Sequence, residues 1–124
     1  MHIFVLNSKS MQEDLIKESG FSYTEKGEGK PIIILHGLMG GLSNFQGVFE
    51  YFSSKKYKVI IPELPVENTP ILKTNVATFS KFVKDFIDFK NLKDVILLGN
   101  SLGGHVGLLF TRDFPELVSG LIIT

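Results

Sequence analysis

The stretch that decides the fold is Asp94-Val95-Ile96-Leu97-Leu98-Gly99-Asn100-Ser101-Leu102-Gly103-Gly104-His105. It begins with an uninterrupted apolar run, Val95 to Leu98, which is typical of a strand buried on both faces of a sheet. Gly99 to Gly103 then fits the pattern G-x-S-x-G, with Ser101 at its centre. Because an amphipathic helical pattern follows, the stretch predicts a sharp strand-to-helix turn that pushes the serine hydroxyl outward.

The two glycines of this pattern have a steric role in the predicted turn. Gly99 and Gly103 flank Ser101 at a distance of two residues, where the turn brings backbones together and leaves no room for a Cβ atom. The following helix would direct its free N–H groups and its positive dipole end at the serine, where an oxyanion would form. The alternative is a glycine-rich turn that contains an incidental serine.

The stretch resembles the nucleophile elbow of the α/β-hydrolase superfamily. By that resemblance Ser101 is the catalytic nucleophile, Gly99 and Gly103 support the elbow, and the Leu102 N–H is one donor of the oxyanion hole. Asn100 precedes the serine where the superfamily frequently has a histidine, and this departure leaves the substrate class open.

A second motif follows the apolar run that ends at Leu35. The loop His36-Gly37-Leu38-Met39-Gly40 resembles the H-G-x-x-G oxyanion loop of the same superfamily. By that resemblance the Leu38 N–H is the second oxyanion donor, while His36 and Gly37 support the loop and do not relay protons. Both motifs lie at the carboxyl ends of predicted strands, where open α/β sheets bind ligands.

Strand and helix patterns alternate along the chain. Strands are predicted at 21–24, 31–35, 57–61, 95–98 and 121–123, and helices from Ser43 to Phe52, from Thr74 or Asn75 to Phe86, and from Leu102 to Phe114. This alternation predicts an α/β fold with a mainly parallel sheet and helices on both faces. Residues 1–20 are an uncertain N-terminal segment, in which residues 3–6 are either an edge strand or extra sequence ahead of a start at Met11. Residues 21–124 are expected to form the N-terminal part of an α/β-hydrolase domain, which lacks the later strands that carry the acid and the histidine.

Composition limits the classes of partner. The chain has 124 residues, 44% of them hydrophobic and 21% charged, and a formal net charge of zero. These values are typical of one globular domain, and the absence of a long Lys/Arg run or a membrane-length apolar run disfavours nucleic acid and membrane partners.

The chain has no cysteine, which excludes disulfides and a cysteine nucleophile and is in keeping with a cytoplasmic protein. Its histidines, His2, His36 and His105, have no metal-ligand spacing, so neither a metal nor another cofactor is expected.

The acid and the base of a catalytic triad are not apparent in the sequence. The superfamily order is serine, then acid, then histidine. After Ser101 the only carboxylates are Asp113 and Glu116, which we expect to be solvated, and His105 is expected on the helix surface. The resemblance therefore covers the first half to two-thirds of the fold. We expect an incomplete hydrolase fold, an N-terminal fragment of a longer protein, with little turnover of its own.

The function expected of the parent protein is hydrolysis of a carboxylic ester or related acyl compound of small size, through an acyl-enzyme on Ser101. A non-catalytic α/β domain that acts by binding or self-assembly is the alternative, because the apolar terminal strand 121–123 would leave an open sheet edge through which the chain could form a homo-oligomer. A nucleotide-binding domain is disfavoured, since neither glycine-rich loop matches G-x-G-x-x-G or G-x-x-x-x-G-K followed by Ser or Thr.

Overall fold

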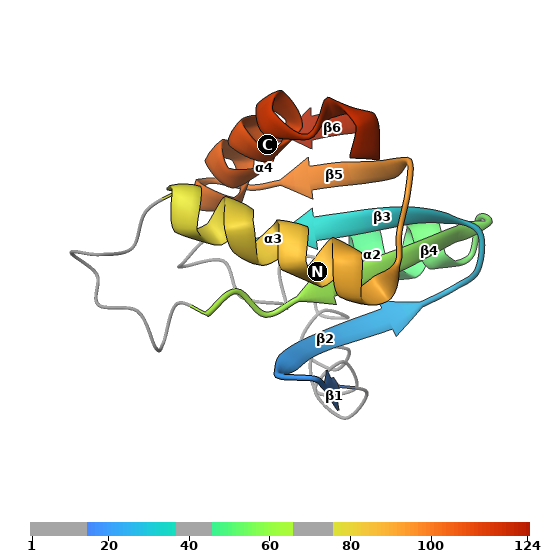
Figure 1. The fold of residues 1–124 in the computed structure, drawn as a ribbon. Helices are drawn as coiled ribbons and strands as arrows, with labels where there is room; N and C mark the ends of the chain where they lie inside the picture. Colours follow the sequence, from blue (N-terminus) through green and yellow to red (C-terminus); the bar gives the residue numbers. More distant parts are fainter. Residues whose placement is uncertain (1–14, 37–45, 66–75) are drawn as a thin grey trace.

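The structure is a computed structural model, and it describes residues 15–36, 46–65 and 76–124 (Figure 1). Within these ranges the elements are β1 (Ile16–Glu18), β2 (Phe21–Lys26), β3 (Lys30–Leu35), α2 (Gln46–Ser53), β4 (Tyr57–Pro62), α3 (Val76–Lys90), β5 (Val95–Gly99), α4 (Leu102–Asp113), the 3-10 helix η3 (Pro115–Leu117) and β6 (Val118–Ile123).

The six described strands form one sheet in the order β1-β2-β4-β3-β5-β6. The pairs β1/β2 and β2/β4 are antiparallel, whereas β4, β3, β5 and β6 run parallel to one another. The predicted mainly parallel α/β sheet is therefore confirmed. The sequence did not predict β1, because this three-residue strand contains a single apolar residue, Ile16.

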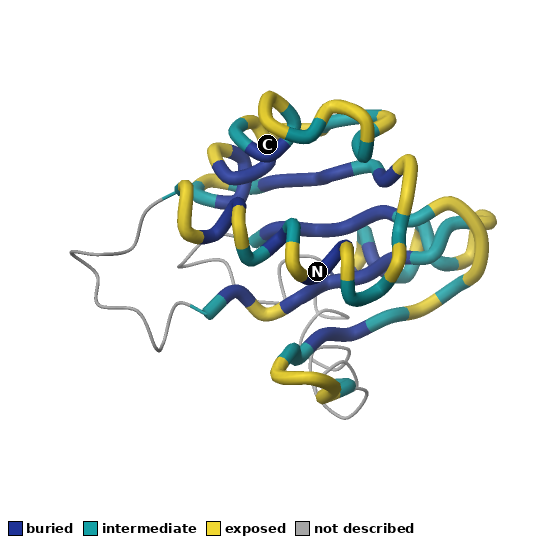
Figure 2. Tube along the Cα trace, viewed as in Figure 1, coloured by how far each residue is buried: buried dark blue, intermediate teal, exposed yellow. Residues whose placement is uncertain are grey.

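Alternate side chains of the central strands belong to two separate cores, as a period of two requires. Ile33 and Leu35 of β3 pack on the side of α3 and α4, together with Phe86 and Phe110. Ile32 and Ile34 point to the opposite face, where they pack with Phe49 of α2. Figure 2 shows that the middle of the sheet is buried along most of its length. The predicted helices on both faces are confirmed.

α2 and α4 end within one residue of the sequence patterns, whereas α3 continues to Lys90, four residues beyond the last residue of its predicted apolar stripe. The predicted stripe on α3 includes Phe79, Val83 and Phe86, and all three are fully buried. α4 ends at Asp113, one residue before the predicted end, and the Phe114 N–H caps it by donating to the Phe110 carbonyl at 2.8 Å. The possible strand at 3–6 and the proposed helix caps at Ser43, Thr74 and Asn75 lie outside the described residues.

The order of the strands reverses beside β3. The chain moves from β3 to β4 on one side, and then crosses β3 to form β5 on its other side. The helix that follows β3 is on one face of the sheet and α4, which follows β5, is on the other (Figure 1). In open α/β sheets this reversal opens a crevice at the carboxyl ends of the two strands. The loops after Leu35 and Gly99 both begin there.

Candidate active site at the β5–α4 turn

Ser101 lies at the tip of the turn between β5 and α4, and it is exposed to solvent. Its backbone has φ 56° and ψ −119°, a conformation that residues with a Cβ atom rarely adopt. Such strain persists only where the surrounding structure holds it in place. The turn therefore presents the serine hydroxyl outward at the carboxyl end of a central strand.

Backbone atoms of neighbouring elements leave no room for a side chain at Gly99 or Gly103. A Cβ atom at Gly99 would lie 2.4 Å from the Gly103 carbonyl oxygen, and a Cβ atom at Gly103 would lie 1.9 Å from the Leu35 carbonyl oxygen. Real Cβ atoms do not approach this closely, and backbone atoms cannot rotate away as a side chain can. Any other residue at either position would force β5, α4 and β3 apart.

Hydrogen bonds from two neighbouring strands hold the turn. On one side the Asn100 N–H donates to the Leu35 carbonyl of β3 at 3.0 Å. On the other side Thr124 donates its N–H to the Gly99 carbonyl at 2.9 Å and accepts from the Ser101 N–H at 3.4 Å. The Asn100 side-chain amide also donates to the Thr124 hydroxyl at 3.1 Å. The sequence gives no signal for this role of Thr124, because the contact depends on the register of β5 and β6.

The first turn of α4 offers a backbone donor beside the serine. The Gly103 and Gly104 N–H groups bond to the carbonyls of Asn100 and Ser101, each at 2.9 Å. Within the part of the chain that the structure describes, the Leu102 N–H has no acceptor. A free N–H at the positive end of a helix dipole is suited to stabilise an oxyanion formed beside Ser101.

The second predicted donor, Leu38, lies outside the described residues, as does Gly37. His36 directly follows β3 and is half-buried. The parallel register that pairs Leu35 with Gly99 makes the loops after β3 and β5 begin side by side. His36 therefore lies beside the start of the β5–α4 turn, and its supporting role remains a prediction.

The structure does not bring an acid and a histidine together beside Ser101 among the described residues. His105 is exposed on α4, and none of its described neighbours forms a side-chain hydrogen bond or ion pair with it. Asp113 and Glu116 are exposed, as expected. α4 has 12 residues, so Asp113 at its far end lies about 18 Å from the elbow at ~1.5 Å per residue. Neither carboxylate is placed to serve as the triad acid.

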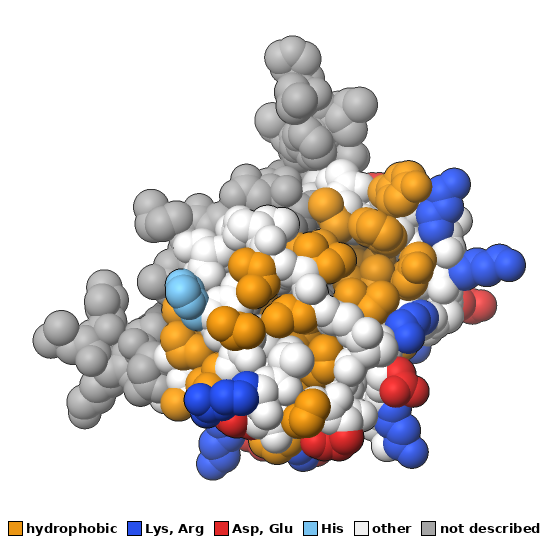
Figure 3. Space-filling model, turned by 90° about the horizontal axis from the view of Figure 1, so that it is seen from above, with side chains coloured by type: hydrophobic (Ala, Val, Ile, Leu, Met, Phe, Trp, Pro, Cys, Tyr) orange, Lys and Arg blue, Asp and Glu red, His pale blue; other side chains and the backbone are white. Residues whose placement is uncertain are grey.

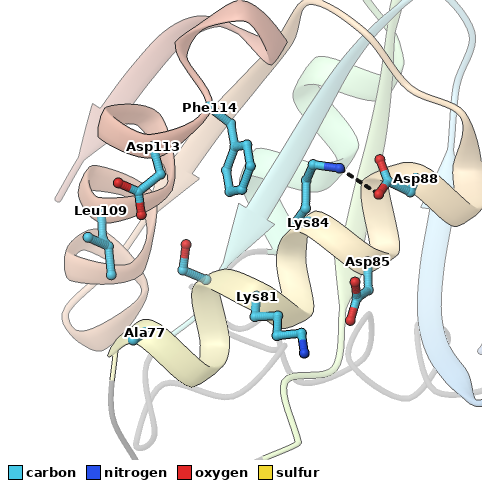
Figure 4. A pocket seen from close by; sticks show the side chains of 9 residues that line it. Ala77, Lys81, Lys84, Asp85, Asp88, Leu109, Asp113 and Phe114 are labelled. Carbon is cyan, nitrogen blue, oxygen red and sulfur yellow. Dashed lines mark hydrogen bonds and ion pairs between the residues drawn. The ribbon is translucent and has the colours of Figure 1, made fainter.

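A groove of about 450 Å³ lies between α3 and α4 on the outer surface (Figure 4). Its lining is Ala77, Ser80, Lys81, Lys84, Asp85, Asp88, Leu109, Asp113 and Phe114. The Lys84 ammonium is 2.6 Å from the Asp88 carboxylate and 5.4 Å from the centre of the Phe114 ring. None of residues 99–103 lines the groove, so it is separate from the elbow.

Between residues 15–36, 46–65 and 76–124, no cluster of three or more His, Asp or Glu side chains is arranged to hold a metal ion. Over the same ranges, no helix has both the length and the apolar character needed to cross a bilayer.

Comparison with known proteins identifies the family. A family model described as the alpha/beta hydrolase fold matches residues 30–124. The chain is 31% identical over 107 residues to a putative esterase/lipase of Mycoplasma genitalium, covering 83% of this chain and 40% of that protein. It is also 31% identical over 112 residues to the 2-hydroxy-6-oxo-6-phenylhexa-2,4-dienoate hydrolase of Comamonas testosteroni, covering 82% of this chain and 38% of that protein.

Solved structures give the same result. An alpha/beta hydrolase enzyme from the metagenome of sediments of the Mar Chica lagoon, Morocco, superimposes with a TM-score of 0.83 and 61% identity, over 88% of this chain and 50% of that one. A marine microorganism esterase superimposes with a TM-score of 0.74 and 27% identity, over 83% of this chain and 40% of that one. The chain thus spans half or less of the length of these relatives. With the strand order, the elbow and the family match in agreement, the chain belongs to the alpha/beta hydrolase family.

Proposed function

We propose that Ser101 is the nucleophile of a serine hydrolase that cleaves small carboxylic esters or related acyl compounds. One observation carries the proposal: an exposed serine is held in a strained backbone conformation, directly before a helix whose first N–H, that of Leu102, is free among the described residues. This combination supports a serine nucleophile and an oxyanion-stabilising N–H donor at the same turn.

The proposed chemistry is acyl transfer followed by hydrolysis. The Ser101 hydroxyl oxygen attacks the substrate carbonyl carbon and loses its proton to a histidine base, and the carbonyl electrons move onto oxygen. The Leu102 N–H, with that of Leu38 as the second donor, stabilises this oxyanion, and each such donor is typically worth about 10²–10³ in rate. The oxyanion collapses and expels the alcohol, which takes up the proton. Water then cleaves the acyl-enzyme by the same steps and releases the acid.

The base and the acid of this mechanism are not among the described groups near Ser101. By family resemblance they lie on loops after later strands. The chain covers 40% of the Mycoplasma relative and 50% of the Mar Chica enzyme. We therefore propose that the complete triad belongs to a longer polypeptide, and that these 124 residues alone turn over little substrate.

The proposed ester-type substrate is supported by the relatives' names, which include a putative esterase/lipase and a marine esterase. The hydrolase of Comamonas testosteroni acts on a dienoate that carries a keto group. Esters and this keto-dienoate both contain a carbonyl carbon, which is the atom that the proposed Ser101 nucleophile attacks.

Labelling by a fluorophosphonate probe tests whether Ser101 is activated. The probe forms a covalent bond with a serine whose hydroxyl is activated by a base, and the product is detected by mass spectrometry of the intact chain. We expect labelling of a protein that carries the full triad, and its complete loss in Ser101→Ala. Ser54→Ala is the matched control, because Ser54 is also exposed and its hydroxyl bonds only to the Tyr51 carbonyl among the described groups.

Two labelling results would contradict parts of the proposal. Labelling of the 124-residue chain itself, lost in Ser101→Ala, would mean that a base already reaches the serine, and the idea of an inactive piece would be wrong. Labelling that persists in Ser101→Ala would contradict the assignment of the nucleophile.

A second candidate function, self-assembly, is favoured by one observation on the far edge of the sheet. β6 pairs only with β5 among the described strands, and its sequence, Val118–Ile123, contains no charged residue. Figure 3, which views the molecule from the side of α4 and β6, shows hydrophobic side chains gathered on this face. Leu108, Ile122 and Ile123 are the exposed large hydrophobics there. Such an edge favours pairing with another strand.

A further inference from the structure

We propose that Thr124 is a positioning residue for Ser101, acting through the side chain of Asn100. This inference rests on the proposed role of Ser101 as nucleophile. The elbow clamp, as we name it, consists of the hydrogen bond from the Asn100 side-chain amide to the Thr124 hydroxyl, together with the two backbone hydrogen bonds that Thr124 makes with Gly99 and Ser101.

The clamp encloses the strained residue. Thr124 directly follows β6, and its backbone bonds reach the residue two before the serine and the serine itself, at 2.9 and 3.4 Å. The side-chain bond reaches the residue between them, Asn100, at 3.1 Å. Thus three consecutive residues of the turn are each tied to the one threonine.

Asn100 is also the link between the two sides of the turn. Its N–H is bonded to the Leu35 carbonyl at 3.0 Å, while its side chain is bonded to Thr124. The residue before the nucleophile is therefore held by β3 through its backbone and by the end of β6 through its side chain. A residue held from both sides cannot rotate freely to let Ser101 leave φ 56°.

Only the side-chain bond depends on the identity of the residues. Any residue other than proline at position 124 keeps both backbone bonds, whereas the bond to Asn100 requires a hydroxyl or an equivalent acceptor. Among the described residues it is the one side-chain hydrogen bond made by residues 99–103 of the elbow. Removing it should loosen the turn without unfolding the sheet, because both side chains lie at the surface or half-buried.

The test compares Thr124→Val, which keeps the shape of the side chain and removes the hydroxyl, with Thr124→Ser, which keeps the hydroxyl. The first measurement is hydrogen exchange of the Ser101 amide by NMR, since this amide donates to Thr124. The second is the rate of fluorophosphonate bond formation at saturating probe, separated from probe binding. Thr111→Val is the matched control, because it removes a threonine hydroxyl that bonds to the Gly107 carbonyl within α4, away from the elbow.

We expect Thr124→Val to raise the exchange rate at Ser101 and to lower the rate of bond formation by roughly three- to tenfold, the usual worth of one hydrogen bond. Thr124→Ser should restore both values, and Thr111→Val should change neither. Asn100→Ala should match Thr124→Val, and the double variant should lose no more than either single one, since both remove the same bond.

The inference would be overturned if Thr124→Val left Ser101 exchange unchanged, if Thr124→Ser behaved like Thr124→Val, or if the effects of Asn100→Ala and Thr124→Val were additive. The labelling rate is measured on a protein that carries the full triad, and if that protein is not labelled at Ser101 the proposed activity fails. Hydrogen exchange is measured on the 124-residue chain itself, and it decides whether the clamp holds Ser101 whatever the labelling result.

Discussion

Ser101 combines an exposed hydroxyl with a backbone conformation that glycine tolerates better than serine. Gly99 and Gly103 must be glycine because backbone atoms occupy the space of a side chain at both positions. A Cβ atom at Gly103, for example, would meet the carbonyl of Leu35. The turn therefore has a serine at a position whose positive φ favours glycine, and glycines at Gly99 and Gly103, where no side chain fits.

This arrangement predicts that Ser101→Gly stabilises the protein. The substitution relieves the φ of 56° but increases the freedom of the unfolded chain, and we expect a net gain of about 1 kcal/mol in the free energy of unfolding. Denaturant unfolding of Ser101→Gly beside Ser101→Ala measures the gain, since both variants lack the hydroxyl. Equal unfolding midpoints for the two would show that the serine is not strained.

A second prediction concerns Gly103. A valine there would place its Cβ 1.9 Å from the Leu35 carbonyl oxygen, so we expect Gly103→Val to cost about 4 kcal/mol or more and to prevent normal folding. The control is Gly107→Ala on the same helix, where the added Cβ would meet the ends of two flexible side chains, Leu121 at 3.1 Å and Leu35 at 3.9 Å. That variant should stay within about 1 kcal/mol of wild type. Thermal unfolding compares them, and a normally folded Gly103→Val would refute the elbow geometry.

Between secondary-structure elements, the last turn of α3 is tied to β2 by a partly buried ionic contact. The Lys90 ammonium lies 2.6 Å from the Glu25 carboxylate and 4.7 Å from the centre of the Tyr23 ring. Burial lowers the pKa of Lys90, but hydrogen bonds and charge interactions with Glu25 and Tyr23 outweigh it, and the pKa is raised above the usual value of 10.5. The contact therefore stabilises the charged form of the lysine in the folded protein.

The raised pKa of Lys90 determines how the stability contributed by its ionic contact changes with pH. Because the folded protein holds the Lys90 proton more tightly than the unfolded chain, the contact contributes fully below the usual lysine pKa and is lost as the pH rises through the raised value. Lys90→Met should cost about 1 kcal/mol at neutral pH, and this cost should vanish at strongly alkaline pH.

Urea unfolding of wild type and Lys90→Met across that pH range measures the cost. Lys84→Met is the matched control, since Lys84 forms a more exposed pair with Asp88 on the same helix, worth about 0.3–0.5 kcal/mol. A cost at Lys90 that stayed constant into alkaline pH would mean that it comes from packing and not from charge.

How far the sequence predicts these elements depends on how local their signals are. The sequence predicts the elbow because its strand, turn and helix signals all fall within residues 94–105. It predicts α3 because apolar residues repeat along one face of that helix. The sequence does not predict β1, because a three-residue strand with two charged side chains is defined only by its pairing with β2. The contacts of Thr124 could not be predicted either, because they depend on the register between β5 and β6. Leu38 and its loop lie outside the described residues, so the second oxyanion donor stays a prediction.

For the molecule as a whole, the two edges of the described sheet differ in character. β1 is short and carries the exposed charges of Lys17 and Glu18, features that protect an edge from pairing. β6 is twice as long and uncharged, and Ile122 and Ile123 are 45% and 53% exposed. The self-assembly alternative is therefore confined to one edge.

This contrast predicts concentration-dependent association of the 124-residue chain through β6. Ile122→Lys should shift the chain toward monomer, because a charge on an edge strand opposes pairing. Tyr51→Lys is the control, since Tyr51 is 58% exposed on α2 and lies away from this edge. Sedimentation velocity over a range of concentrations measures the effect, and a wild-type monomer at the highest concentration would count against the alternative.

The frame around Ser101 also has a consequence for the order of events during folding. Its parts, Leu35, residues 99–104 and Thr124, are far apart in the chain, so they meet only after β3, β5 and β6 have docked, and closing such long loops is a late and costly step. Until then nothing compels the serine to leave a relaxed backbone. We therefore expect the strained conformation of Ser101 to form late in folding, and a nascent chain whose strands have not yet paired to hold this serine in a relaxed backbone conformation.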